Sequence, residues 1–257
     1  MIEAKVTPEA IRAMKARGER VAALTAYDYP MAKLLDEAGI PFILVGDSLG
    51  MVVLGYPDTT HVTMADMEHH ARAAARAKTN GLLGVDLPFK SYETVADAVT
   101  NAKRLVAAGA EFIKLEGGRE MLPQIRAILD ADIPVCGHLG MLPQSVLKEG
   151  GYRIKGKKES EHQALIEDAK LLTDAGAFAI VLELVTPQVA AEISGSISIP
   201  TICIGSGGGC DGQILVSYDL IGLFPWFRPK FVKPLADCAA EIKSAVTQWK
   251  KSVEEAS

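Results

Sequence analysis

Three acidic side chains follow short apolar runs, at positions where a strand would end. Asp47 closes the run FILVGD, Asp86 follows LLGV, and Glu116 follows FIKL. If these runs are parallel strands whose ends meet, the carboxylates repel one another unless something positive shares the space. Oxygen ligands without histidine or thiolate favour a hard divalent ion, so the three acids predict a magnesium site.

A simpler interpretation is that each acid caps the following helix or pairs with a surface base. For any single acid the two interpretations are about equally good, because aspartates after strands often cap helices. For the three together the metal site is favoured, because catalytic groups gather at the carboxyl ends of barrel strands. Asp86 in particular precedes Leu87 and Pro88, a poor context for a cap.

Three further polar side chains fall at the same level of the predicted strands. Lys114 shares a strand face with Glu116 by the period of two, either to meet a substrate or to form a structural ion pair. Glu183 in IVLELV is flanked by aliphatic residues, which suits either a proton carrier with a raised pKa or a hydrogen-bonded structural glutamate. His138 in VCGHLG could orient a substrate or pack in the core.

The elements that position these residues repeat as an aliphatic run, a loop and an amphipathic helix. Eight such units with no GxGxxG after the first run predict a (β/α)8 TIM barrel, as one domain over residues 1–257. A helix capped by Thr7 precedes the first strand, Thr63 with Asp66 caps another, and Gly109 ends the helix that contains Val95. The predicted strands are 21–27, 42–47, 82–87, 112–117, 135–139, 179–185, 201–206 and, with the weakest signal, 218–224.

Charge and composition favour small-molecule chemistry. Lys plus Arg is 27 against 32 for Asp plus Glu, a net charge of -5, so neither nucleic acid nor an anionic membrane is an expected partner. The first twenty residues mix acids and bases without an apolar run, so we expect a cytoplasmic protein. The cysteines lack CxxC spacing and are expected to be reduced and structural: Cys136, Cys203, Cys210 and Cys238. The run GSGGG at 205–209 is interpreted as a flexible loop that lets backbones approach closely.

Six stretches in this order resemble the ketopantoate hydroxymethyltransferase family: TAYDYP, ILVGDSLGMVVLGY, VDLPFKSY, IKLEGG, PVCGHLGMLPQS and CDGQIL. The resemblance spans nearly the whole chain. It implies a barrel that transfers a hydroxymethyl group from 5,10-methylenetetrahydrofolate to 3-methyl-2-oxobutanoate, through a magnesium-stabilised enolate, in pantothenate biosynthesis. It also implies a homo-oligomer, commonly a decamer.

The resemblance further implies roles for individual residues. Asp47 and Asp86 would bind magnesium, and Glu116 would complete the site directly or through water. Ser48 with Lys114 would hold the substrate carboxylate.

Glu183 matches the family's proposed acid/base. Chelation of a 2-oxo acid by the metal polarises its carbonyl, which lowers the cost of removing a proton from the adjacent carbon. Asp47 and Asp86 are therefore also predicted to lie at the substrate, and His138 is predicted to lie there because it ends the fifth predicted strand.

The chain departs from the family pattern away from the predicted metal ligands. His61 stands where proline is expected, Lys90 where methionine is common, and Tyr218 where histidine is common. The GSGGG run replaces a GAG-type turn.

Two other functions compete with this one. A lyase or phosphomutase of the phosphoenolpyruvate type would use the same barrel and magnesium, but it usually adds a catalytic cysteine loop. We find no counterpart, because Cys136 and Cys203 lie inside predicted strands and Cys210 in the glycine loop. A barrel without catalytic activity is disfavoured because the predicted site residues are all present.

Overall fold

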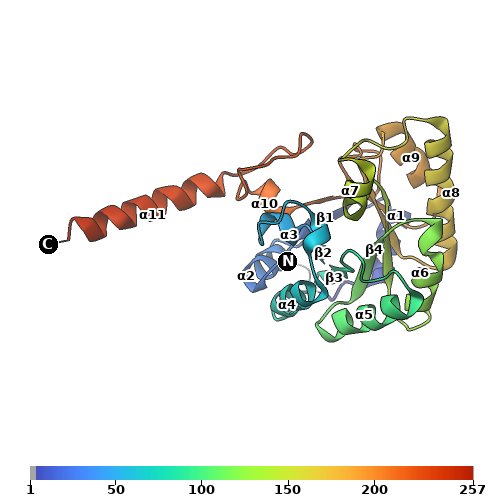
Figure 1. Ribbon diagram of the computed structural model, residues 1–257, viewed down its shortest axis with the longest axis horizontal. Coiled ribbons are helices and arrows are strands. Elements are labelled where there is room, and N and C mark those ends of the chain that lie inside the picture. Colours follow the sequence, from blue (N-terminus) through green and yellow to red (C-terminus); the bar gives the residue numbers. More distant parts are fainter. Residues whose placement is uncertain (1–3, 257) are drawn as a thin grey trace. The chain divides into compact units, whose positions relative to one another are not determined.

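The strands of the protein close into a parallel barrel in the order β1 to β8. Figure 1 shows the first four strands, with helices such as α4, α5 and α6 outside them. The computed structural model describes residues 4–256. Helix α1 precedes the first strand, so the predicted (β/α)8 barrel with an N-terminal helix is confirmed. The strands are β1 Val21–Thr25, β2 Phe42–Val45, β3 Leu82–Asp86, β4 Phe112–Glu116, β5 Val135–Gly140, β6 Ala179–Glu183, β7 Thr201–Ile204 and β8 Gly212–Leu215.

The helices begin and end at the predicted signals. The Thr7 hydroxyl accepts a hydrogen bond from the Ala10 amide at 3.2 Å, and Thr63 with Asp66 forms a capping box. Gly109 adopts a φ of +113° just after α5, a conformation that favours glycine. The helices are α1 Pro8–Ala16, α2 Tyr29–Glu37, α3 Leu49–Val52, α4 Met64–Ala75, α5 Val95–Ala107, α6 Leu122–Leu129, α7 Val146–Glu149, α8 Glu159–Ala175, α9 Pro187–Ser196, α10 Ser217–Leu220 and α11 Cys238–Glu254, with short 3-10 helices at Thr59–His61, Arg119–Met121 and Pro143–Ser145.

The eighth strand lies earlier than the sequence predicted. The prediction of a strand at 218–224 was wrong, because β8 is Gly212–Leu215 and Ser217–Leu220 forms α10. Gly212 explains the error, since glycine and glutamine give a weak strand signal. A Cβ on Gly212 would lie 2.4 Å from the Val21 carbonyl oxygen, so the barrel closes there only around a glycine.

The prediction of four reduced cysteines was also wrong. Cys203 and Cys210 form a disulfide with a Cα–Cα distance of 5.9 Å, while Cys136 and Cys238 are free. The glycine loop between the two cysteines turns the chain back on itself. A spacing of seven residues does not predict such a turn. The close approach expected of this loop is present, because a Cβ on Gly209 would lie 2.8 Å from that of Ala191.

The core fills the end of the barrel where the strands begin. The Phe112 ring lies 4.7 Å from that of Phe42 and 5.1 Å from that of Phe178, measured between centroids. Ile11 of α1 belongs to the same buried cluster, so α1 covers this end. Because this end is closed by apolar packing, polar chemistry is confined to the opposite end.

The chain divides after Ile214 into two compact units. The second unit, from Leu215, contains α10 and the long helix α11, in which Ala239 is the one buried residue within the described chain. The single domain predicted over residues 1–257 stays a prediction. Over residues 4–256 we find no helix with the length and apolarity that crossing a membrane requires.

Candidate active site

The structure brings the predicted acids together at the carboxyl end of the barrel. Asp86 and Glu116 are the last residues of β3 and β4, and Asp47 follows β2 by two residues. All three are buried. Gly46 makes room for them, because a Cβ there would lie 3.5 Å from Oδ2 of Asp86 and 3.1 Å from Ser48 Oγ.

Asp86 is the most heavily bonded of the three acids. Its Oδ1 accepts a hydrogen bond from Lys114 Nζ at 2.7 Å, and its Oδ2 accepts one from the Asp47 amide at 3.2 Å. Lys114 is buried, so this is an internal ion pair of the kind that the structural interpretation of Lys114 expected. Ser48 lies beside the acids, and its hydroxyl is hydrogen-bonded to that of Tyr27 at 2.9 Å.

Gln144 connects the acids, although no prediction included it. Its Nε2 donates to Oδ2 of Asp47 at 2.8 Å, and its backbone amide donates to Oε2 of Glu116 at 3.0 Å. Its Oε1 accepts a 2.6 Å hydrogen bond from the hydroxyl of Tyr92. Gln144 lies in the loop after β5, where spacing carries no periodic signal, and its occurrence in GHLGMLPQS was the one available indication.

His138 lies between two of the carboxyl groups. Its Nδ1 is 3.6 Å from Oε1 of Glu116, and its Nε2 is 3.4 Å from Oε2 of Glu183. Within residues 4–256 neither ring nitrogen has a hydrogen-bond partner, although the ring is buried. Burial and the positive charge of Lys114 lower the pKa of His138 well below its usual range, so the neutral imidazole is favoured.

Burial makes the acids resist ionisation. It raises the pKa of Asp47 to about 7, with a further contribution from the charge of Asp86. It raises the pKa of Glu183 to about 8, partly offset by Lys114, and that of Glu116 well above the ordinary value. For Lys114, burial lowers the pKa, but the nearby carboxylates outweigh it and leave the pKa above its usual range. If all four acids were ionised around this one cation, the site would carry an excess of negative charge, which adds to the cost of burial.

This donor set suits a hard cation that also takes oxygens from a substrate. In the part of the chain that the structure describes, no three His, Cys, Asp or Glu side chains are grouped so that they could jointly hold a metal ion. Magnesium commonly uses one or two carboxylates and completes its shell with water and substrate oxygens. Asp47 and Asp86 are the two carboxylates that fit that pattern, since the Asp47 amide donates to Oδ2 of Asp86.

Tyr152 is a second residue that sequence reasoning missed. Burial raises the pKa of its hydroxyl, and the charges of Glu183 and Asp47 raise it further, so Tyr152 lies within electrostatic reach of the acids. Two residues that depart from the family pattern are placed as well. His61 lies 3.2 Å from Oδ1 of Asp58, and Lys90 lies 5.4 Å from the centre of the Phe89 ring.

A closed parallel barrel with acids at its carboxyl end defines an enzyme of the (β/α)8 class. Among solved structures the chain is similar to a phosphoenolpyruvate phosphomutase from Streptomyces platensis subsp. rosaceus, with a TM-score of 0.66, 16% identity and coverage of 97% of this chain and 88% of that chain. It is also similar to phosphonopyruvate hydrolase, with a TM-score of 0.63, 18% identity and coverage of 82% and 80%. At these identities the likeness shows the fold.

Sequence comparison is more specific. A family model described as ketopantoate hydroxymethyltransferase matches residues 5–257. The chain is 52% identical to a 3-methyl-2-oxobutanoate hydroxymethyltransferase of Ignicoccus hospitalis, covering 97% of this chain and 95% of that protein. It is 51% identical to one of Syntrophus aciditrophicus, covering 97% and 92%. The chain belongs to the ketopantoate hydroxymethyltransferase family, and its activity is hydroxymethyl transfer.

Proposed function

We propose that the protein transfers a hydroxymethyl group from 5,10-methylenetetrahydrofolate to 3-methyl-2-oxobutanoate, using magnesium, and so forms ketopantoate for pantothenate synthesis. One observation carries the metal and the enolisation step: three buried carboxyl groups and Glu183 gather around a single buried lysine. Such a site favours binding a cation, because the cation relieves the repulsion between the acids and leaves positions in its shell for a chelating substrate.

Each side chain has a role in this proposal. Lys114 and Ser48 hold the carboxylate of the oxo acid, which fixes carbon 3 towards Glu183. Glu183 removes the proton from carbon 3, and its partly exposed position leaves it open to the substrate. The buried His138 ring lies beside that carboxyl group, with Nε2 3.4 Å from Oε2, and limits the positions the group can take. Asp47 and Asp86 would hold the metal, which when bound would polarise the keto oxygen and compensate negative charge in the site.

Hydrogen–deuterium exchange tests enolisation without the folate. We expect magnesium-dependent exchange at carbon 3 of 3-methyl-2-oxobutanoate in D₂O, followed by NMR, with EDTA abolishing it. Absence of exchange with both magnesium and manganese would contradict the proposed proton removal. Formation of ketopantoate on adding 5,10-methylenetetrahydrofolate then tests the co-substrate.

Asp86→Asn tests the metal assignment. Removing this charge should abolish the magnesium response and lower exchange at least about 100-fold, because the cation loses a ligand. Asp130→Asn, an exposed aspartate after α6, is the matched control and should behave as the wild type. A magnesium titration unchanged by Asp86→Asn would remove Asp86 from the site.

We also propose that the protein is a homo-oligomer, with a decamer expected from the family. Helix α11 supports association, because exposed apolar residues recur on it at spacings of four, three and four: Ile242, Val246, Trp249 and Val253. Light scattering after gel filtration should give a multiple of 27.4 kDa. Trp249→Ser should reduce that mass and Lys250→Ser should not, whereas a monomeric wild type would refute the proposal.

A further inference from the structure

Gln144 contacts two of the acids but has no role in the proposal above. It is buried, and it is the second residue of the 3-10 helix Pro143–Ser145, which follows β5. The first amides of a helix have no partner within it, so the Gln144 amide is able to donate to Oε2 of Glu116, at 3.0 Å. Its side chain reaches Oδ2 of Asp47 at 2.8 Å. One residue therefore holds the carboxyl groups of two acids that come from different parts of the barrel.

The surroundings of Gln144 fix which way its side-chain amide points. Nε2 donates to two acceptors, Oδ2 of Asp47 and the Leu87 carbonyl, the second at 2.9 Å. Oε1 accepts a hydrogen bond from the Tyr92 hydroxyl at 2.6 Å. A flipped amide would place Oε1 against a carboxyl group and a carbonyl, so it would lose both hydrogen bonds of Nε2 and set acceptors against one another. Gln144 is therefore held as a hydrogen-bond donor to Asp47.

Tyr92 is fixed by contacts that do not involve the acids' side chains. The residue is buried, and its carbonyl accepts a hydrogen bond from Nε2 of Gln124, on α6, at 3.4 Å. The carbonyl of the preceding Ser91 accepts one from Nδ2 of Asn101, on α5, at 2.7 Å. Two helices thus hold the segment from which the Tyr92 hydroxyl reaches Gln144.

Asp47 needs this support more than the other two acids do. Asp86 and Glu116 end their strands, and each is paired in the ladder with a residue of the next strand. Asp47 lies two residues beyond β2, where the ladder has ended, and its carbonyl accepts a hydrogen bond from the Gly50 amide in a turn. The strand ladder therefore does not set the direction of the Asp47 carboxyl group, whereas the hydrogen bond from Gln144 holds that group directly.

We propose that Gln144, directed by Tyr92, is a positioning residue that turns Asp47 towards the bound cation, an inference that rests on the proposed function. Holding Oδ2 of Asp47 leaves Oδ1 available to the cation. Carboxylates that bind metals are themselves hydrogen-bonded, and loss of the partner weakens metal binding by about 10- to 100-fold. The Tyr92 hydroxyl bonds to Gln144 and, at 3.5 Å, to the Glu116 carbonyl, so its effect on Asp47 passes through Gln144.

Manganese binding to the full chain, followed by the EPR signal of the free ion, tests the proposal. Gln144→Met keeps the length of the side chain and the backbone amide but removes the Nε2 donor, and it should raise the Kd for manganese about 10-fold or more. Tyr92→Phe should raise the Kd about 3-fold, and the double variant should bind no more weakly than Gln144→Met, since Tyr92 acts through Gln144. At saturating manganese, deuterium exchange at carbon 3 should recover to within about 3-fold of the wild-type rate, because Glu183 is unchanged.

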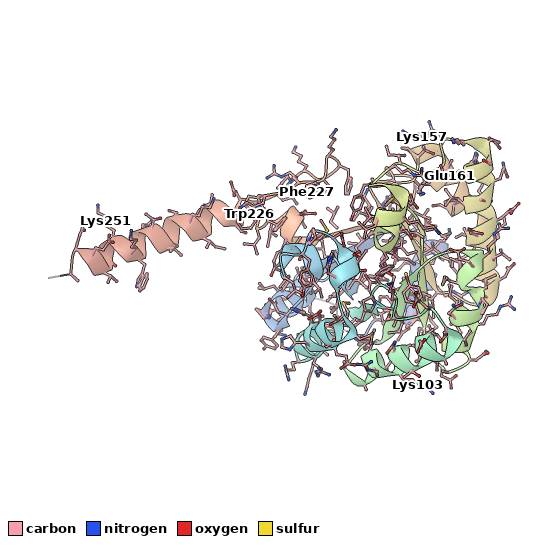
Figure 2. The ribbon with its side chains drawn as sticks, viewed as in Figure 1. Lys103, Lys157, Glu161, Trp226, Phe227 and Lys251 are labelled. Atoms are coloured by element: carbon pink, nitrogen blue, oxygen red, sulfur yellow. A yellow bond between two sulfur atoms is a disulfide. The ribbon has the colours of Figure 1, made fainter. Side chains whose placement is uncertain are left out.

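Gln124→Met is the matched control. Gln124 is also a buried amide that supports the Tyr92 segment, but it forms no hydrogen bond with the buried acids in the part of the chain that the structure describes. Its Kd for manganese should stay within about two-fold of the wild-type value, because the side chain holding Asp47 is intact. Lys103→Met, at an exposed lysine on the outer side of α5, is a surface control for the assay (Figure 2).

A Kd of Gln144→Met within about two-fold of the wild-type value would overturn the proposal, as would an equal weakening in Gln124→Met. Effects of the two single variants that add fully in the double variant would overturn it too, because Tyr92 would then act independently of Gln144. If Gln144→Met does not fold, Tyr92→Phe, which removes one oxygen atom, decides alone, and an unchanged Kd refutes the proposal. A wild type that neither binds manganese nor exchanges deuterium would refute the proposed function, whereas a failure confined to the variants refutes this inference alone.

Discussion

The two ends of the barrel are made from the same strands but from opposite kinds of side chain. Strand β4 begins at Phe112, packed against aromatic rings, and ends at Glu116, whose carboxyl resists ionisation. Glycine serves both ends: a Cβ on Gly84 would lie 2.0 Å from the Phe112 ring, and Gly46 leaves space for Asp86. The apolar end supplies stability, and the polar end carries charges that lower the stability of the metal-free protein.

Glu183→Gln should show the largest effect confined to the polar end. Removing the proton acceptor is expected to slow exchange at carbon 3 by about 10²- to 10⁴-fold, while magnesium still binds. NMR measures the exchange, and a magnesium titration of protein fluorescence measures the binding. Glu37→Gln, on α2, is the control. An exchange rate within a few-fold of the wild type would leave Glu183 as a structural glutamate.

Phe112→Ala, at the apolar end, should lower stability and leave catalysis nearly unchanged, which is the reverse of the effect of Glu183→Gln. The ring is fully buried, and its loss should lower the free energy of unfolding by about 3–5 kcal/mol. Denaturant unfolding measures this change, and Phe231→Ala, at a more exposed phenylalanine, should cost far less. Turnover per folded molecule should stay close to that of the wild type. A large fall in turnover without loss of stability would contradict the division between the two ends.

The sequence predicted which acids meet better than it predicted the closure of the barrel. Asp47, Asp86 and Glu116 were visible because each interrupts an apolar run, and a parallel barrel turns distance along the chain into proximity. Gln144 was not visible, because its position depends on how the loop after β5 folds back over the acids. The strand at Gly212 was not predicted because the feature that requires a glycine there is the backbone of β1, which is far away in the sequence.

The pH dependence of stability sharpens the comparison. The pKa of Glu183 is raised from 4.5 to about 8 in the folded protein, so folding takes up a proton between these values. The stability that this proton confers is complete below pH 4.5 and is lost as the pH rises through 8, by about 1.4 kcal/mol per pH unit for one proton. In EDTA the melting temperature should therefore fall by roughly 3 °C or more per unit from pH 6 to 8.

If magnesium binds among the acids, the melting temperature should fall less with rising pH, because the ion replaces the proton as the compensating charge. Glu183→Gln should make the fall shallower without magnesium, since glutamine does not titrate while Asp47 and Glu116 still do. Differential scanning fluorimetry over the pH series measures both. A melting temperature that rises over this range would mean that the acids are not held in the protonated form.

Removing the Cys203–Cys210 disulfide tests whether the polar end of the barrel also contributes to stability. Between its two cysteines, the Ser206 hydroxyl donates to the Leu182 carbonyl at 2.8 Å and accepts from the Val185 amide at 2.9 Å, on either side of Glu183. Cys210→Ser should lower the free energy of unfolding by about 2 kcal/mol, because a short loop is no longer closed in the unfolded chain. It should also lower kcat more than it raises KM for the oxo acid, since Glu183 is held less firmly.

Cys238→Ser, at a free cysteine, is the matched control. Dithiothreitol should lower the melting temperature of the wild type to that of Cys210→Ser and leave the variant unchanged. If dithiothreitol changes the melting temperature of neither protein, the disulfide contributes no stability. The stability of the carboxyl end of the barrel would then come from the apolar end alone. If Cys210→Ser lowers stability but leaves kcat unchanged, the disulfide stabilises the loop without positioning Glu183. Stability and catalysis would then be more separate than the hydrogen bonds of Ser206 suggest.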